Sequence, residues 1–284
     1  SFHFSAEAKT EWEIRQAERR LEEAAKLESQ SKFSNENKVE IEQKFSDHAD
    51  RVELRIEDLE SKGKISAAVD LASKFETSLR AHEQILTKFD NQIGASSPSE
   101  NKIEIEKEHG SLKLKVKSTL GDIVNVRTKL EDKVHENSDN QSASVEIKNE
   151  TKVKAEAKLN DVSRSIDSLR KYLENKKDKL SAETRVQAEA QIAEAEKLVL
   201  EAKIKLEAES YGEAYNLGNE ALRVIKQTQV LIEAQSEFGF EIEIENENHQ
   251  RSGDDNPKNS KSDEDENEDH EEKIKIETDL DLRL

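Results

Sequence analysis

The clearest regularity in the sequence is a run of apolar residues spaced three and four positions apart between positions 65 and 93. This spacing places them on one face of an α-helix of about eight turns. The run consists of Ile65, Ala68, Ala72, Phe75, Leu79, His82, Leu86, Phe89 and Ile93. Similar stripes recur along most of the chain, which predicts a protein built mainly from long amphipathic helices.

The composition agrees with helices that are largely surrounded by water. Hydrophobic residues make up 33% of the chain and charged residues 38%, and there are only two prolines and eight glycines. A helix in an extended bundle buries one narrow apolar stripe, so such a bundle needs fewer apolar residues than a compact globule. We therefore expect a mainly α fold, an elongated antiparallel helical bundle with coiled-coil hairpins.

The first domain that the pattern predicts is a three-helix bundle over residues 1–93. Ser5 is expected to cap its first helix, and Gly63 is expected to end the second helix in a left-handed conformation. The connection at Gly63 is short, so the second and third helices should pack antiparallel. Trp12 lies beside the apolar stripe of the first helix and is expected to be a core anchor.

Residues 99–177 are expected to form a helical hairpin, but the first half of this region fits two structures. Positions 102–117 alternate apolar and polar residues, as a β-hairpin does. Helical spacing continues beyond the point where the alternation stops, which favours a helix. The residues with this spacing are Leu112, Val116, Ile123, Val126 and Leu130.

An Ala- and Glu-rich helical hairpin is predicted over residues 181–237. Ser181 is the expected N-cap of its first helix, because serine hydroxyls accept hydrogen bonds from the free backbone N–H groups there. Tyr211 and Gly212 are expected to turn the chain into the second helix.

The periodicity changes from helical to alternating after position 237. Residues 238–245 are predicted to be a strand with one apolar face, formed by Phe238, Phe240, Ile242 and Ile244. Residues 246–272 contain eleven acidic and three basic residues and are expected to be a disordered acidic linker. The last segment, 273–284, is predicted to be an amphipathic strand whose apolar face consists of Ile274, Ile276, Leu280, Leu282 and Leu284.

Phe2 and Phe4 alternate in the same way, so the two chain ends are expected to form a small β element. Three possibilities remain open for the chain ends. The terminal strands pair with each other and lie on the bundle, or the segment 273–284 adds to a sheet in another copy or in a partner protein. Alternatively, the chain ends in a helix or its tail is recognised as a sorting element.

Charge and missing residue types restrict the function. The formal charge of -19 without a basic patch argues against nucleic-acid binding, which relies on Lys and Arg contacts to phosphate. The absence of cysteine excludes disulfides, thiolate chemistry and zinc–thiolate sites. No window holds the roughly 18 apolar residues of a membrane span. The chain starts at Ser1 without methionine, from which we expect that a signal or anchor has been removed.

Two incomplete metal-site patterns are present. His48 and His82 are expected on neighbouring antiparallel helices with an axial offset of roughly 6 Å, but no third ligand is evident. Alternate oxygen ligands of a calcium loop are matched by Asp263, Asp265, Asn267 and Asp269. The required glycine and bidentate glutamate of that loop are replaced by Glu268 and Ile274, so only weak, nonspecific cation binding is expected there.

Several N-terminal stretches carry a resemblance to a known family. They are the residues Ser5-Ala6-Glu7-Ala8-Lys9, Glu11-Trp12 and Arg15-Gln16-Ala17-Glu18-Arg19-Arg20-Leu21-Glu22-Glu23-Ala24, followed by Phe45, His48, Ala49, Arg51-Val52, Phe75-Glu76, Leu79, Ala81-His82-Glu83 and Ile85-Leu86. This pattern resembles uncharacterised exported helical-bundle proteins of candidate-phylum (patescibacterial) bacteria over residues 1–93. A weaker similarity covers Tyr211-Gly212-Glu213-Ala214. The resemblance implies a helical architecture and export, and it implies no activity or binding residues.

The sequence therefore predicts a non-enzymatic, extracytoplasmic structural or adhesive protein of a bacterial cell envelope, with no cofactor. Self-association or docking to an envelope protein is expected through its terminal strands. The alternative is a ligand- or cation-responsive binding module that acts through the acidic tail or the grooves between helices.

Overall fold

The computed structural model describes residues 5–96, 99–140 and 142–239. These residues form seven α-helices and one short 3-10 helix, and no strand occurs among them. The elements are α1 (Ala6–Ser29), α2 (Asn35–Ser61), α3 (Ile65–Ser96), α4 (Ser99–Asp139), α5 (Val145–Lys176), η1 (Lys177–Lys179), α6 (Ala182–Glu207) and α7 (Tyr211–Phe238). The helices pack antiparallel, which confirms the mainly helical prediction.

Serine residues are the N-caps of four of these helices. The hydroxyl oxygen of each accepts a hydrogen bond from the backbone N–H three residues further on, at 3.1–3.4 Å. This bond satisfies one of the N–H groups that lack a partner inside the helix. The four residues are Ser5, Ser34, Ser144 and Ser181.

Glycine in the left-handed region ends the described helices at two points. Gly63 has φ of +74° between α2 and α3, as the sequence predicted, and Gly239 has φ of +73° directly after α7. Other residues pay a steric cost at such angles, and glycine does not.

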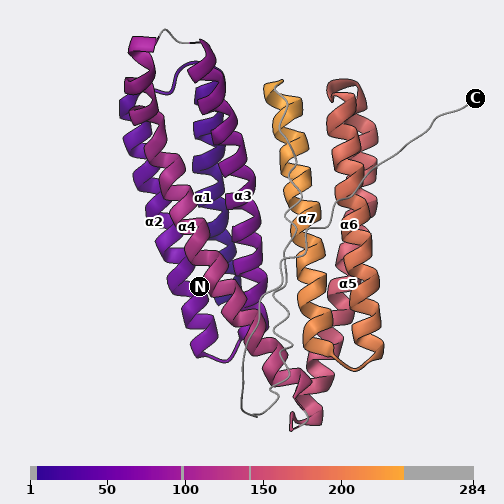
Figure 1. Cartoon of the computed structure of the whole chain (residues 1–284). Helices are drawn as coiled ribbons and strands as arrows, with labels where there is room; N and C mark the ends of the chain where they lie inside the picture. The colour runs from indigo at the N-terminus through magenta and orange to yellow at the C-terminus, as the bar shows by residue number, and fades with distance from the viewer. Residues whose placement is uncertain (1–4, 97–98, 141, 240–284) are drawn as a thin grey trace, which may run out of the picture. The chain divides into compact units, whose positions relative to one another are not determined.

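The helices fall into two neighbouring groups, α1–α4 and α5–α7, which Figure 1 shows side by side. In the first group α1 packs on α2 and α3, and α4 runs along α3 and also contacts α2. In the second group α7 lies against both α5 and α6. Contacts of α7 with α3 and α4 join the groups.

The segment with two candidate structures is helical throughout, because α4 is one helix from Ser99 to Asp139. Leu112, Val116 and Ile123 are buried along it. Helical spacing sustained over many turns therefore outweighs a short alternating stretch.

Two sequence predictions are wrong within the described residues. Phe238 is the last residue of α7 rather than the start of a strand, and its ring packs edge-on against Phe89 of α3, with 5.5 Å between the ring centroids. Phe238 lies four residues after the buried Ala234, so it continues the helical stripe until Gly239 ends the helix. Trp12 is 49% exposed and stands edge-on to His48 instead of filling the core.

The remaining positions of the predicted β element lie outside the described residues. They are Phe2, Phe4, Phe240, Ile242, Ile244 and all of 273–284.

The start of α7 is fixed by the end of α4. The Asp139 carboxylate accepts hydrogen bonds from the backbone N–H groups of Gly212 at 2.8 Å and Glu213 at 3.0 Å. The turn before α7 is made by Glu209, whose φ is +60°. Gly212 lies within the helix, where it allows close approach of α4, so it does not make the turn that the sequence suggested.

Candidate functional site

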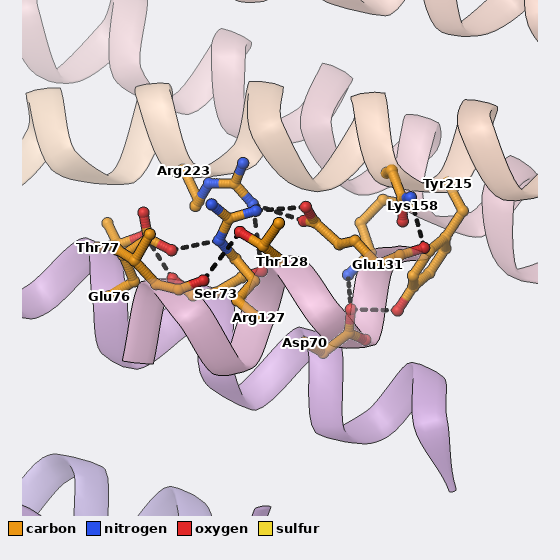
Figure 2. Close-up of polar contacts among 12 residues, drawn as sticks. Asp70, Ser73, Glu76, Thr77, Arg127, Thr128, Glu131, Lys158, Tyr215 and Arg223 are labelled. Atoms are coloured by element: carbon orange, nitrogen blue, oxygen red, sulfur yellow. Dashed lines mark hydrogen bonds and ion pairs between the residues drawn. The ribbon is translucent and has the colours of Figure 1, made fainter. Parts of the chain in front are cut away.

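Charged side chains meet in the interior where α3, α4 and α7 contact one another. We call this set the charge cluster, and it consists of Glu76, Arg127, Glu131 and Arg223. Glu76 is only 1% exposed and Arg127 only 4%. Figure 2 shows the cluster together with the polar residues around it.

The charge cluster is a continuous chain of ion pairs. Arg127 on α4 donates to Glu76 on α3 and to Glu131 one turn further along α4. Arg223 of α7 donates from Nη1 to Glu131 Oε1 at 3.0 Å. Arg80, next to the cluster on α3, donates from Nε to Glu76 Oε1 at 2.8 Å. Three helices are thereby joined through their charged groups.

Neighbouring charged side chains keep both the buried Glu76 carboxylate and the buried Arg127 guanidinium ionised. Burial alone would raise the pKa of the Glu76 carboxyl, but Arg223, Arg127 and Arg80 together hold it below its ordinary value. Burial would likewise lower the pKa of Arg127, and Glu131 and Glu76 more than offset this. The charges of the cluster are therefore matched internally.

A second polar group links α3, α5 and α7 around the buried Tyr215. Its hydroxyl donates to the Asp70 carboxylate and to the Ser66 carbonyl oxygen, the latter at 2.9 Å. The Lys158 ammonium donates to Asp70 Oδ1 at 2.8 Å. Burial and the negative charge of Asp70 raise the pKa of Tyr215 well above its ordinary value. The phenol therefore stays protonated and acts as a hydrogen-bond donor.

A groove runs along the surface between α1 and α7, with α3 as its floor. We call it the α1–α7 groove. It has two adjoining hollows that share Glu18, Ser78, Val230 and Glu233. One hollow extends towards Phe238 and measures about 520 Å³, and the other extends towards Lys74 and measures about 500 Å³.

The two histidines of the predicted metal pair make separate contacts. His48 Nδ1 bonds Glu13 Oε2 at 2.7 Å, between α2 and α1. His82 is buried on α3, and its Nδ1 bonds the Ser78 carbonyl oxygen at 2.8 Å. In the part of the chain that the structure describes, no group of three or more His, Asp or Glu side chains could hold a metal ion.

Most of the other predicted site residues belong to the C-terminal part of the sequence. The acidic positions Asp263, Asp265, Asn267 and Asp269 lie outside the described residues, as do all of the interaction residues except Phe238.

The charge cluster was not predicted from the sequence, although one of its residues stands out in the sequence pattern. Arg127 follows the buried Ile123 by four positions and precedes the buried Leu130 by three, so a charged residue occupies the apolar stripe of α4. A buried arginine requires a partner, which such a position could have indicated. The identity of that partner depends on tertiary packing.

Comparison with protein-family models, curated proteins and solved structures yields no match to this chain. Among the described helices, none combines the length and the apolar composition that crossing a membrane requires.

Proposed function

We propose that the protein is a non-enzymatic structural or adhesive component of a bacterial cell envelope, outside the cytoplasm. Its helical unit acts as a scaffold, and its terminal segments make contact with other copies or with an envelope protein. The observation that carries this proposal is the charge cluster, in which the buried ionised groups of α3, α4 and α7 are engaged with one another.

The charge cluster suits a scaffold because it favours a single helix arrangement. A buried ion pair adds little net stability, but any arrangement that separates its partners leaves a charge buried alone, at a cost of about 3–5 kcal/mol. Tyr215 and Lys158 serve the same purpose at the seam between α3, α5 and α7. The buried polar side chains thus hold helices in register.

The location and the contact segments come from the sequence. The resemblance over residues 1–93 supports export, and the alternating residues of 273–284 support strand addition. Main-chain hydrogen bonds would give such a contact its affinity, and the Ile and Leu side chains would fix its register.

Light scattering over a range of protein concentrations tests the proposal. The full chain is compared with the truncation 1–245 and with a full-length Ile276→Lys/Leu280→Lys variant, and circular dichroism verifies that the helices are retained. We expect higher-order species from the full chain only. A full chain that remains monomeric on its own and with envelope extract would contradict assembly through the terminal segment.

A binding role for the helical unit is the second candidate, and the α1–α7 groove favours it. Surface hollows of about 500 Å³ fall within the size range of ligand sites.

A further inference from the structure

The hollow of the α1–α7 groove nearer to Phe238 is rich in acidic side chains. Two basic side chains line it, Arg19 and Lys26, against five carboxylates. The carboxylates are Glu18, Glu22 and Glu23 of α1 and Glu233 and Glu237 of α7. Glu23 is paired with Arg20 at 2.6 Å, and Lys74 and Arg15 act on Glu18, so two of the five carboxylates already have a cation nearby.

The floor of this hollow holds a buried acceptor. His82 is 5% exposed, and its Nδ1 bonds the Ser78 carbonyl oxygen, so Nδ1 carries the proton and Nε2 the lone pair of the neutral ring. Burial lowers the pKa of His82, which keeps the ring neutral at pH 7. Nε2 has no hydrogen-bond partner among the described residues, although His82 lines the hollow.

Glu18 adds a carboxylate that is partly removed from water. Burial raises the pKa of Glu18, and the Ser78 hydroxyl and Lys74 offset only part of this effect. A cation placed beside Glu18 would stabilise its charged form. His82 Nε2 and the Glu18 carboxylate therefore both favour a positively charged donor in the hollow.

The spacing of the carboxylates on the two walls of the hollow matches the spacing of basic side chains on a helical peptide. Glu18 and Glu22 lie one turn apart on α1, and Glu233 and Glu237 lie one turn apart on α7, which is about 6 Å along each helix. Basic side chains four positions apart on a partner helix have the same spacing. Ala25, Ile85 and Phe238 provide apolar surface between the walls.

We propose that this hollow binds a basic amphipathic peptide segment of a partner protein, with two Lys or Arg side chains between the carboxylates and an apolar residue against Phe238. The inference deepens the second candidate function and is independent of assembly through residues 273–284. The formal charge of -19 would increase the encounter rate with such a segment.

Titration of the isotope-labelled full chain, followed by NMR, tests the proposal. The probe is a blocked short peptide with two lysines four positions apart and leucines beside them. We expect shift changes in residues 19–26, 78–85 and 230–238, and a change at His82 Nε2. Peptides with glutamate for lysine or serine for leucine should bind much more weakly, since each lacks one half of the match.

A matched pair of variants separates the groove from general charge attraction. Glu22→Gln/Glu233→Gln removes two exposed carboxylates from the walls, whereas Glu156→Gln/Glu207→Gln removes two exposed carboxylates from α5 and α6. Exposed ion pairs each contribute only a few-fold to affinity, so we expect about tenfold weaker binding in the first variant and no change in the second.

Equal affinities of the two variants would overturn the proposal, as would shift changes spread over α5 and α6. The light-scattering result does not affect this test, so failure of the groove and failure of tail-mediated assembly are distinguishable.

Discussion

Glu76 and Glu53 are both withdrawn from water, but their neighbours shift the pKa in opposite directions. Three arginines face Glu76 and lower its pKa despite burial. Glu53 of α2 is half-buried, and burial together with the carboxylates of Asp122, Asp50 and Glu57 raises its pKa to about 7. Glu76 therefore stays charged over the physiological range, whereas Glu53 titrates within it.

The raised pKa of Glu53 makes stability depend on pH. The folded state holds the Glu53 proton up to a pKa of about 7, whereas the unfolded chain releases it near 4.5. The contribution of this group is therefore fully present below pH 4.5 and is lost as the pH rises through 7. Because Glu53 is half-exposed, solvent screening reduces the effect to about 1 kcal/mol.

The substitution Glu53→Gln should remove the loss of stability that accompanies ionisation of Glu53 at higher pH. We expect the variant to be about 1 kcal/mol more stable than the wild type at about pH 8 and nearly equal to it at about pH 5. Urea unfolding at the two pH values measures the difference, and Glu156→Gln, at an exposed position of α5, is the control. The same gain at both pH values would show that a cause other than ionisation is responsible.

Local spacing predicted which apolar residues are buried, but not how the charged ones are paired. Phe75, Leu79 and Ile123 are buried as their helical spacing indicates. Glu76 and Arg127 are 51 positions apart, so their contact depends on α4 packing along α3. A sequence pattern within one helix holds no information on that register.

At the scale of the elements, helix ends were the most predictable features because their causes are local. Ser5, Ser181 and Gly63 cap or end helices through their own side-chain and backbone chemistry. The end of α7 was missed because Phe238 satisfies both a helical and an alternating pattern. Gly212 was misjudged because its role depends on α4, which is distant in sequence.

Two glycines within helices differ in the space that an added side chain would find around them. A Cβ at Gly212 would lie 2.5 Å from Ser138 Oγ and 2.8 Å from the backbone Cα of His135. A Cβ at Gly121, on the exposed side of α4, would meet nothing within 4 Å. Backbone atoms cannot move aside cheaply, whereas open space accepts a methyl group freely.

Gly212→Ala should therefore destabilise the protein by about 1–3 kcal/mol, since α7 must shift away from α4. Gly121→Ala should stabilise it by about 0.5–1 kcal/mol through helix propensity. Thermal unfolding of both variants beside the wild type measures this. A stabilising effect of Gly212→Ala would show that α4 and α7 are not in such close contact.

At the scale of the whole helical unit, the two hydrophobic clusters share helices. The first cluster consists mainly of residues from α1–α4 but includes Tyr215 of α7. The second consists mainly of residues from α5–α7 but includes Ala25 of α1 and Ile85 of α3. The sequence predicted the helices but not that each cluster includes residues from the other group of helices. An apolar stripe does not specify the helix that covers it.

Shared clusters predict that residues 5–239 unfold in a single transition. Separation of α5–α7 from α1–α4 would expose parts of both clusters and leave Glu131 of the charge cluster without Arg223. The apolar surface that such a separation exposes makes any partly unfolded state of this kind unfavourable.

Two probes of urea unfolding test this prediction. Fluorescence of Trp12, the only tryptophan, reports on α1 where it contacts His48 of α2, and circular dichroism reports on all helices. Coincident midpoints and equal slopes are expected, because a two-state transition gives the same curve with every probe. Circular dichroism that changes before Trp12 fluorescence does would mean that α5–α7 unfold on their own. The contacts of α7 with α3 and α4 would then be too weak to couple the two groups of helices.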